Sequence, residues 1–73
     1  MKEATNHPFM DYRTVKAWET SKGGYVHVYD VRDLYHNFYI VEKFNEHGGM
    51  DIIYSCRNLE RCIAWAMKYA EQN

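Results

Sequence analysis

Only one stretch of the sequence spaces its apolar residues as an α-helix requires, and it stands at the C-terminal end. In LERCIAWAMKYAEQN, residues 59–73, the apolar positions fall at offsets of 0, 3, 4, 7, 8 and 11. Such offsets form one stripe along a helix. Asn58 stands just before the stripe and can accept from the free amides of the first turn, with Ser55 as an alternative cap. We expect one helix over residues 58–72.

The chain before this helix has the composition and alternation of β-strands. Strands are expected in YRTVKAWET (12–20), GYVHVYDV (24–31), NFYIVEKFN (37–45) and MDIIYS (50–55), with turns at SKGG and EHGG. RDLYHN (32–37) fits either a loop or the end of a long hairpin. Residues 1–11 lack a period and hold the only proline, so they predict an irregular or mobile arm.

Together these elements predict a single α+β domain over residues 1–73. The expected sheet is an antiparallel meander of three to four strands within residues 12–55, with the C-terminal helix packed on one of its faces. One helix covers one face, and no other predicted element is available to cover the second.

The alternation after the Gly23–Gly24 pair assigns residues to these two faces. Val26 and Val28 point to one side, which we assign to the helix together with Val15, Ala17, Ile40 and a residue of the last strand. The open face is then predicted to hold five rings: Trp18, Tyr25, His27, Tyr29 and Tyr39. A one-residue shift of register would exchange the two faces.

The sequence has seven tyrosines and two tryptophans, whose apolar bodies and polar tips suit surfaces that become buried in a complex. We therefore predict the five open-face rings, together with Tyr69 on the helix, as partner-binding residues. Trp65 either completes the core, which is slightly favoured, or joins Tyr69 in a second aromatic patch. Six carboxylates at strand ends and turns are either solvating or complementary to a basic partner: Glu19, Asp30, Asp33, Glu42, Glu46 and Asp51.

Charge and motifs argue against several classes of function. Nine basic and ten acidic side chains give a net charge of -1, which disfavours direct nucleic-acid binding. No apolar run approaches a membrane span, so we expect a cytoplasmic protein without a membrane partner. The histidines at 7, 27, 36 and 47 lack metal-ligand spacing, and no catalytic motif occurs. We predict neither metal, cofactor nor enzymatic activity, with a composite site in a homodimer as the exception.

Cys56 and Cys62 lie six positions apart, unlike the C-x2-C spacing of zinc and redox sites. On one helix their Cα atoms would be roughly 9 Å apart, beyond the reach of an unstrained disulfide. We expect reduced, partly buried thiols.

The order of elements, with NLERCIAWAMKYAEQN entering the last helix, resembles small βββα proteins of phages and mobile elements, several anti-CRISPR proteins among them. That resemblance implies a non-catalytic inhibitor that binds a bacterial host protein or nucleoprotein complex. GGYVHVYDV and NLERCIAWA also resemble HicB-type antitoxins, although NFYIVEKFN is an added strand and a DNA-binding segment is lacking. A further alternative is single-stranded nucleic-acid binding, with Trp18, Tyr25, Tyr29 and Tyr39 as stacking platforms.

Overall fold

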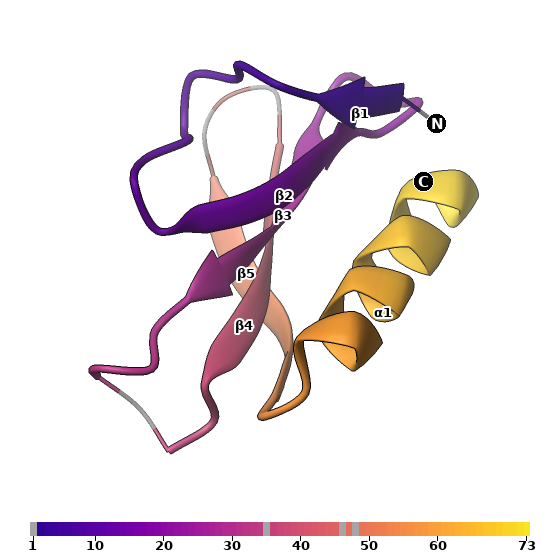
Figure 1. Ribbon diagram of the computed structural model, residues 1–73. Helices are drawn as coiled ribbons and strands as arrows, with labels where there is room; N and C mark the ends of the chain where they lie inside the picture. The colour runs from indigo at the N-terminus through magenta and orange to yellow at the C-terminus, as the bar shows by residue number, and fades with distance from the viewer. Residues whose placement is uncertain (1, 35, 46, 48) are drawn as a thin grey trace.

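The computed structural model describes residues 2–34, 36–45, 47 and 49–73. Its elements are β1 (Lys2–Ala4), β2 (Thr14–Glu19), β3 (Tyr25–Asp30), β4 (Tyr39–Phe44), β5 (Met50–Cys56) and α1 (Leu59–Gln72). The strands form one antiparallel sheet in chain order, and α1 packs on one face of it (Figure 1). The predicted α+β meander with a C-terminal helix is confirmed. The arm adds a short fifth strand, β1, at one edge.

Two local signals of the sequence act where they were expected. Gly23 takes a φ of 86° in the β2–β3 turn, a conformation that favours glycine. A Cβ at Gly24 would collide with the carbonyl oxygen of Phe44. The Asn58 side chain accepts from the amide of Arg61 at 3.0 Å, which confirms it as the N-cap of α1. These residues fix where the hairpin turns and where the helix begins.

The core lies between α1 and the sheet. It is built from three small helix residues and four sheet residues: Cys62, Ala66 and Ala70, with Trp18, Val26, Val28 and Val41. The predicted place of Val26 and Val28 under the helix is confirmed. The small residues of α1 bring the helix close to the sheet, and Trp18, only 2% exposed, supplies the largest ring of this core.

The predicted faces of β2 and β4 are wrong, because the residues that pair with Val26 and Val28 of β3 are not the ones that the sequence placed on their side. Directly opposed residues of antiparallel strands point to the same face of the sheet. Trp18 pairs with Val26 and therefore lies on the helix side with it. Tyr39 likewise pairs with Asp30 and joins the helix side. Ala17 pairs with His27, and Ile40 with Tyr29, so both lie on the opposite face. Val15, at a bulge in β2, is exposed.

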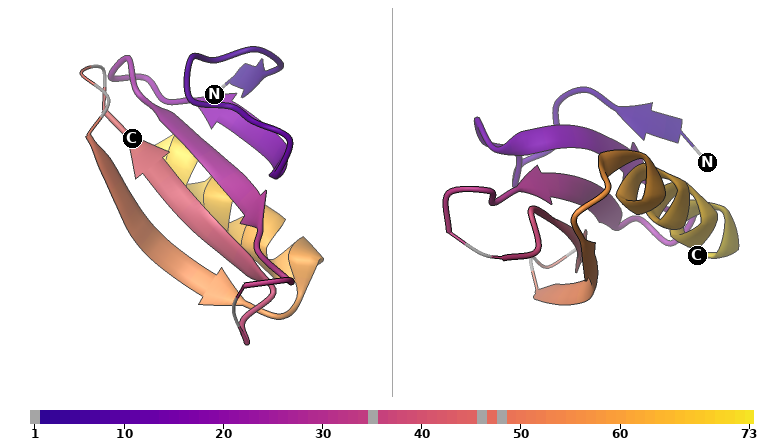
Figure 2. Two further views of the ribbon diagram at one scale, coloured as in Figure 1. Left: turned by 90° about the vertical axis from the view of Figure 1, so that its left-hand side faces the viewer. Right: turned by 60° about the horizontal axis from the view of Figure 1, so that its bottom comes forward.

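The second face was predicted to be open, but the N-terminal arm crosses it. Figure 1 shows the arm and α1 on opposite sides of the sheet, and Figure 2 gives the same arrangement from two further directions. The His7 ring stacks on Tyr25 with centroids 4.7 Å apart, and Phe9 stacks on Phe44 at 4.8 Å. Tyr25, His27 and Tyr29 do lie on this face, as predicted. A second layer of rings therefore covers much of the surface that was assigned to a partner.

No helix in the described part of the chain is both long and apolar enough to cross a membrane.

Replacing Trp18 with alanine should strongly destabilise the fold. The change removes a buried ring from the core and costs about 3 to 5 kcal/mol in free energy of unfolding. Trp65→Ala is the matched control, because Trp65 is 36% exposed and should cost about 1 kcal/mol. Urea unfolding curves of the two variants measure both values. If both variants lost the same free energy of unfolding, Trp18 would not be buried under α1, and the β2–β3 register described above would be wrong.

Candidate functional site

The centre of the arm-covered face is a buried polar pair. His27 is 1% exposed, and its Nε2 lies 2.7 Å from Oε1 of Glu42, which is buried as well. Its Nδ1 lies 3.5 Å from Oγ1 of Thr14. The imidazole thus links β2, β3 and β4 from within. His27 was predicted to bind a partner, but in the folded chain it is out of a partner's reach.

His7 of the arm lies over this pair with its own ring buried. Its Nδ1 accepts from the amide of Phe9 at 3.1 Å, which places the proton of the neutral ring on Nε2. Nε2 is buried without a hydrogen-bond partner among the described residues. Burial, with a smaller contribution from the nearby His27, lowers the pKa of His7 to about 4. The neutral arm histidine is therefore the form that fits the folded protein.

The two predicted tyrosines of this face are engaged within the chain. Tyr25 lies under the His7 ring, and Tyr29 stacks on His27 with centroids 5.1 Å apart. The Tyr29 hydroxyl donates to the Asp11 carboxylate. Burial and this hydrogen bond raise the pKa of Tyr29 to about 12. Both rings are half-buried, so neither stands free on an open sheet.

The remaining predicted site residues lie on the helix side. Trp18 is in the core, and Tyr39 packs at its border with the Arg32 guanidinium 5.9 Å from its ring centroid. Tyr69 is half-buried on α1. The six predicted residues therefore do not form one surface, and Tyr69 is the one that belongs to a partly exposed ring cluster.

That cluster consists of Tyr54, Trp65 and Tyr69, and we call these three residues the ring stack. Tyr54 and Trp65 are nearly parallel, at 9°, with centroids 5.1 Å apart, and Trp65 and Tyr69 are parallel within 10° at 6.2 Å. Within the described part of the chain, neither tyrosine hydroxyl nor the Trp65 indole N–H makes a hydrogen bond. The ring stack is an oriented, partly exposed aromatic surface with unpaired polar tips.

The sequence slightly favours the core for Trp65 and leaves the surface open, and it does not single out Tyr54. The spacing of four between Trp65 and Tyr69 did indicate that these two rings are neighbours on one flank of the helix. The contribution of Tyr54 depends on the strand register, because Tyr54 pairs with Val41 and so faces α1. A bulge at Ile53 intervenes, which simple alternation along β5 does not reveal.

Charges are segregated around the ring stack. Arg61 and Lys68 share the flank of α1 that carries Trp65, whereas Glu60 and Glu71 lie on the other flank. Lys68 and Gln72 line a shallow hollow of about 280 Å³ with Trp65 and Tyr69. Neither Arg61 nor Lys68 forms an ion pair with a described residue. The rim of the ring stack is therefore basic.

The carboxylates expected to face a basic partner are instead close to cationic or imidazole groups of the same chain. Five of the six have such a neighbour: Glu19 with Lys2, Asp30 with Arg32, Asp33 with Arg13, Glu42 with His27, and Asp51 with Lys43. Glu46, the sixth, lies outside the described residues. Acidic side chains thus contribute little unpaired charge near the rings.

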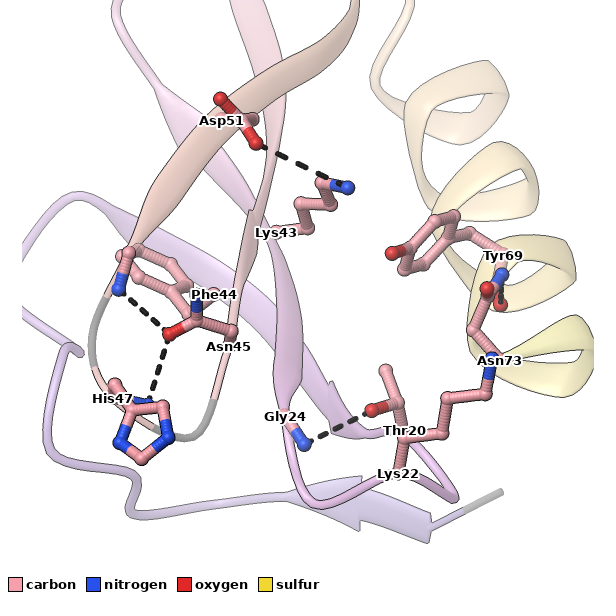
Figure 3. A pocket seen from close by; sticks show the side chains of 11 residues that line it. Thr20, Lys22, Gly24, Lys43, Phe44, Asn45, His47, Asp51, Tyr69 and Asn73 are labelled. Atoms are coloured by element: carbon pink, nitrogen blue, oxygen red, sulfur yellow. Dashed lines mark hydrogen bonds and ion pairs between the residues drawn. The ribbon is translucent and has the colours of Figure 1, made fainter.

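Tyr69 also lines a pocket of about 270 Å³ between the turns of the sheet and the end of α1 (Figure 3). Its ring points from α1 toward β4, where Nζ of Lys43 lies 3.9 Å from Oδ2 of Asp51. Asn45 Oδ1 accepts from the amides of His47 and Gly49, and Thr20 Oγ1 accepts from Gly24. These groups hold the turns in place. Among the described residues, no three His, Cys, Asp or Glu side chains are arranged to hold a metal ion.

Comparisons with protein-family models, curated proteins and solved structures found no match to this chain.

The buried arm histidine predicts loss of stability in mild acid. Because the folded-state pKa of His7 lies below 6.5, the unfolded chain binds more protons between about pH 6.5 and 4. The free energy of unfolding should therefore fall as the pH drops through this range, by up to about 3 kcal/mol from His7 alone.

Urea unfolding between pH 7 and pH 4 measures this loss. His7→Phe keeps a ring on Tyr25 and should flatten the pH dependence. His36→Phe, which changes an exposed histidine, should leave it unchanged. Parallel curves for the wild type and His7→Phe would show that the arm histidine does not titrate as described.

Proposed function

We propose that this chain is a non-catalytic protein-binding module, with the ring stack as the centre of its binding surface. The observation that carries the proposal is the co-orientation of three rings, Trp65 exposed and Tyr54 and Tyr69 half-buried, whose hydroxyl and N–H groups lack partners in the described chain. Tyr and Trp dominate the binding energy of many interfaces, because they combine a large apolar area with a polar tip.

The packing of the ring stack reduces the cost of binding. Tyr54 is held by the β4–β5 ladder, while Trp65 and Tyr69 are held by α1. The mutual stacking of the rings restricts their rotamers before any partner arrives. An interface built on such side chains loses less conformational entropy than one built on long flexible side chains.

The basic rim specifies the chemistry of the partner surface. Arg61 and Lys68 flank Trp65 without ion-pair partners of their own in the described chain. A protein with acidic residues around an apolar hollow complements this arrangement, and the charges speed association and fix orientation more than they add affinity.

Nucleic acid fits the same surface less well. Trp65 is already stacked with two rings of its own chain, and Glu60 and Glu71 lie on the other flank of the helix. A backbone-binding groove needs many cations, whereas the whole chain has a net charge of -1. Binding of single-stranded nucleic acid is therefore the alternative that the experiment below has to exclude.

The resemblance in element order to anti-CRISPR and related phage proteins supports the choice of partner. We assign the chain to the cytoplasm of a bacterial host, where it acts by covering a surface of a defence protein or nucleoprotein complex. Inhibition by occlusion needs affinity and shape but no reaction. The matching surface on such a complex has an apolar hollow for the ring stack and acidic residues opposite Arg61 and Lys68.

Trp65→Ala should abolish most partner binding while leaving the chain folded. Truncating a central interface tryptophan commonly costs about 2 kcal/mol or more, which is roughly a 30-fold weaker Kd. Affinity capture from bacterial lysates, run in parallel with the wild type and Trp65→Ala, identifies proteins that depend on this ring. Titration with the purified partner then gives the ratio of Kd values.

Tyr12→Ala is the control for that experiment, because Tyr12 is 87% exposed but lies far along the chain from the ring stack. It should capture the same proteins as the wild type. If Trp65→Ala also does so, the ring stack is not the binding surface. Micromolar binding of a labelled mixed-sequence oligonucleotide, with a steep salt dependence, would favour the nucleic-acid alternative.

Reversing the charge of Lys68 should slow association with the same partner. Lys68→Glu places an acidic group on the rim, and the rate constant for association should fall about tenfold at low salt and recover as salt screens the repulsion. Lys2→Glu makes the same change on β1 and should have a much smaller effect. Equal rates for the two variants, measured by stopped flow, would exclude an acidic patch opposite Lys68.

A further inference from the structure

The two cysteines of the chain meet at the junction of the sheet and the helix. Cys56 is the last residue of β5, and Cys62 lies in the first turns of α1. Their Sγ atoms are 3.2 Å apart, and both thiols are free. The sequence estimate of a large separation assumed that both lay on one helix. Cys56 lies on the strand instead, and the turn at Arg57 and Asn58 folds Cys62 back onto it.

We propose that Cys56 and Cys62 are a reversible disulfide site, oxidised by a small-molecule disulfide of the glutathione class.

The backbone around both cysteines supports a bond between them. Cys56 is held in the ladder by its pairing with Tyr39, and the amide of Cys62 donates to the carbonyl of Asn58 at 3.1 Å. A disulfide has an S–S distance of about 2.05 Å, so each sulfur has to move by only about half an ångström. Rotation of the two side chains is enough to supply that movement.

The difference in exposure assigns the order of the two steps. Cys56 is half-buried, whereas Cys62 is 0% exposed under the sheet. The Cys56 thiolate attacks one sulfur of the oxidant RSSR, an S–S bond to Cys56 forms, and the R–S–S–R bond breaks with release of RS⁻. The Cys62 thiolate then attacks the Cys56 sulfur and displaces the second RS⁻. The two protons from the protein thiols convert both leaving groups to RSH, so the protein loses two hydrogen atoms and RSSR is reduced.

The second step should be the slow one at neutral pH. Burial, with the hydrogen bond to Cys56, raises the pKa of Cys62 to about 12. Little Cys62 thiolate is therefore present at neutral pH, and ring closure should accelerate as the pH rises. The closed bond would fix the first turns of α1, which directly precede Trp65, to the end of β5, which carries Tyr54.

The test compares the folded and the unfolded chain. The full-length protein is equilibrated with graded ratios of oxidised to reduced glutathione, with and without urea, and free thiols are then alkylated for mass spectrometry. The equilibrium constant for the Cys56–Cys62 disulfide should be about tenfold or more higher in the folded chain, because the fold holds the sulfurs together. An equal or smaller constant in the folded chain overturns the proposal.

Two further arms separate this site from ordinary thiol reactivity. Cys56→Ser, which changes the half-buried residue, should leave Cys62 unmodified by glutathione because Cys62 is buried. In the wild type, disulfide closure should speed up between pH 7 and pH 9. A folded protein that stops at a glutathione adduct on Cys56, or that forms only disulfides between chains, would show that the two sulfurs do not meet.

Discussion

The pairing of Trp18 with Val26 is the contact on which the arrangement of this small domain depends. It sets the register of the β2–β3 hairpin and places the largest core ring against α1. In the described part of the chain a single helix, α1, covers one face of the sheet, and in so small a domain that face needs enough apolar area to hold the helix. Cys62, Ala66 and Ala70 are small because the ring and the valines of the sheet already fill the space. The strand register that buries Trp18 and the small residues of α1 therefore depend on each other.

The other face is closed by a different kind of contact. Instead of a second helix, a short arm lays His7 and Phe9 onto Tyr25 and Phe44, above a buried pair of His27 and Glu42. Buried polar groups of this kind are tolerated where they are hydrogen-bonded. The sheet therefore has an apolar side and a mixed aromatic and polar side. The binding surface that we propose, the ring stack, accordingly lies at the border between β5 and α1.

Short-range sequence patterns correctly predicted the helix and the two faces of β3. The helix bounds follow from the apolar stripe and Asn58, and the alternation in β3 places Val26 and Val28 correctly. The faces of β2 and β4 depend on which residues meet across a turn, and one step of register reverses them. The covering role of His7 and Phe9 has no periodicity to reveal it. Trp65 and Tyr69 are visible as a pair in the sequence, whereas Tyr54 joins them only once the strand pairing is known.

The division of charge across α1 has a consequence that net charge conceals. Arg61 and Lys68 on one flank and Glu60 and Glu71 on the other give the helix an electric moment directed across its axis. In the field of a charged partner, such a moment produces a torque, which turns the freely tumbling molecule before any atoms touch. Steering of this kind requires no excess of either sign. If the proposed binding function holds, a nearly neutral protein can in this way approach a charged surface with its tryptophan side foremost.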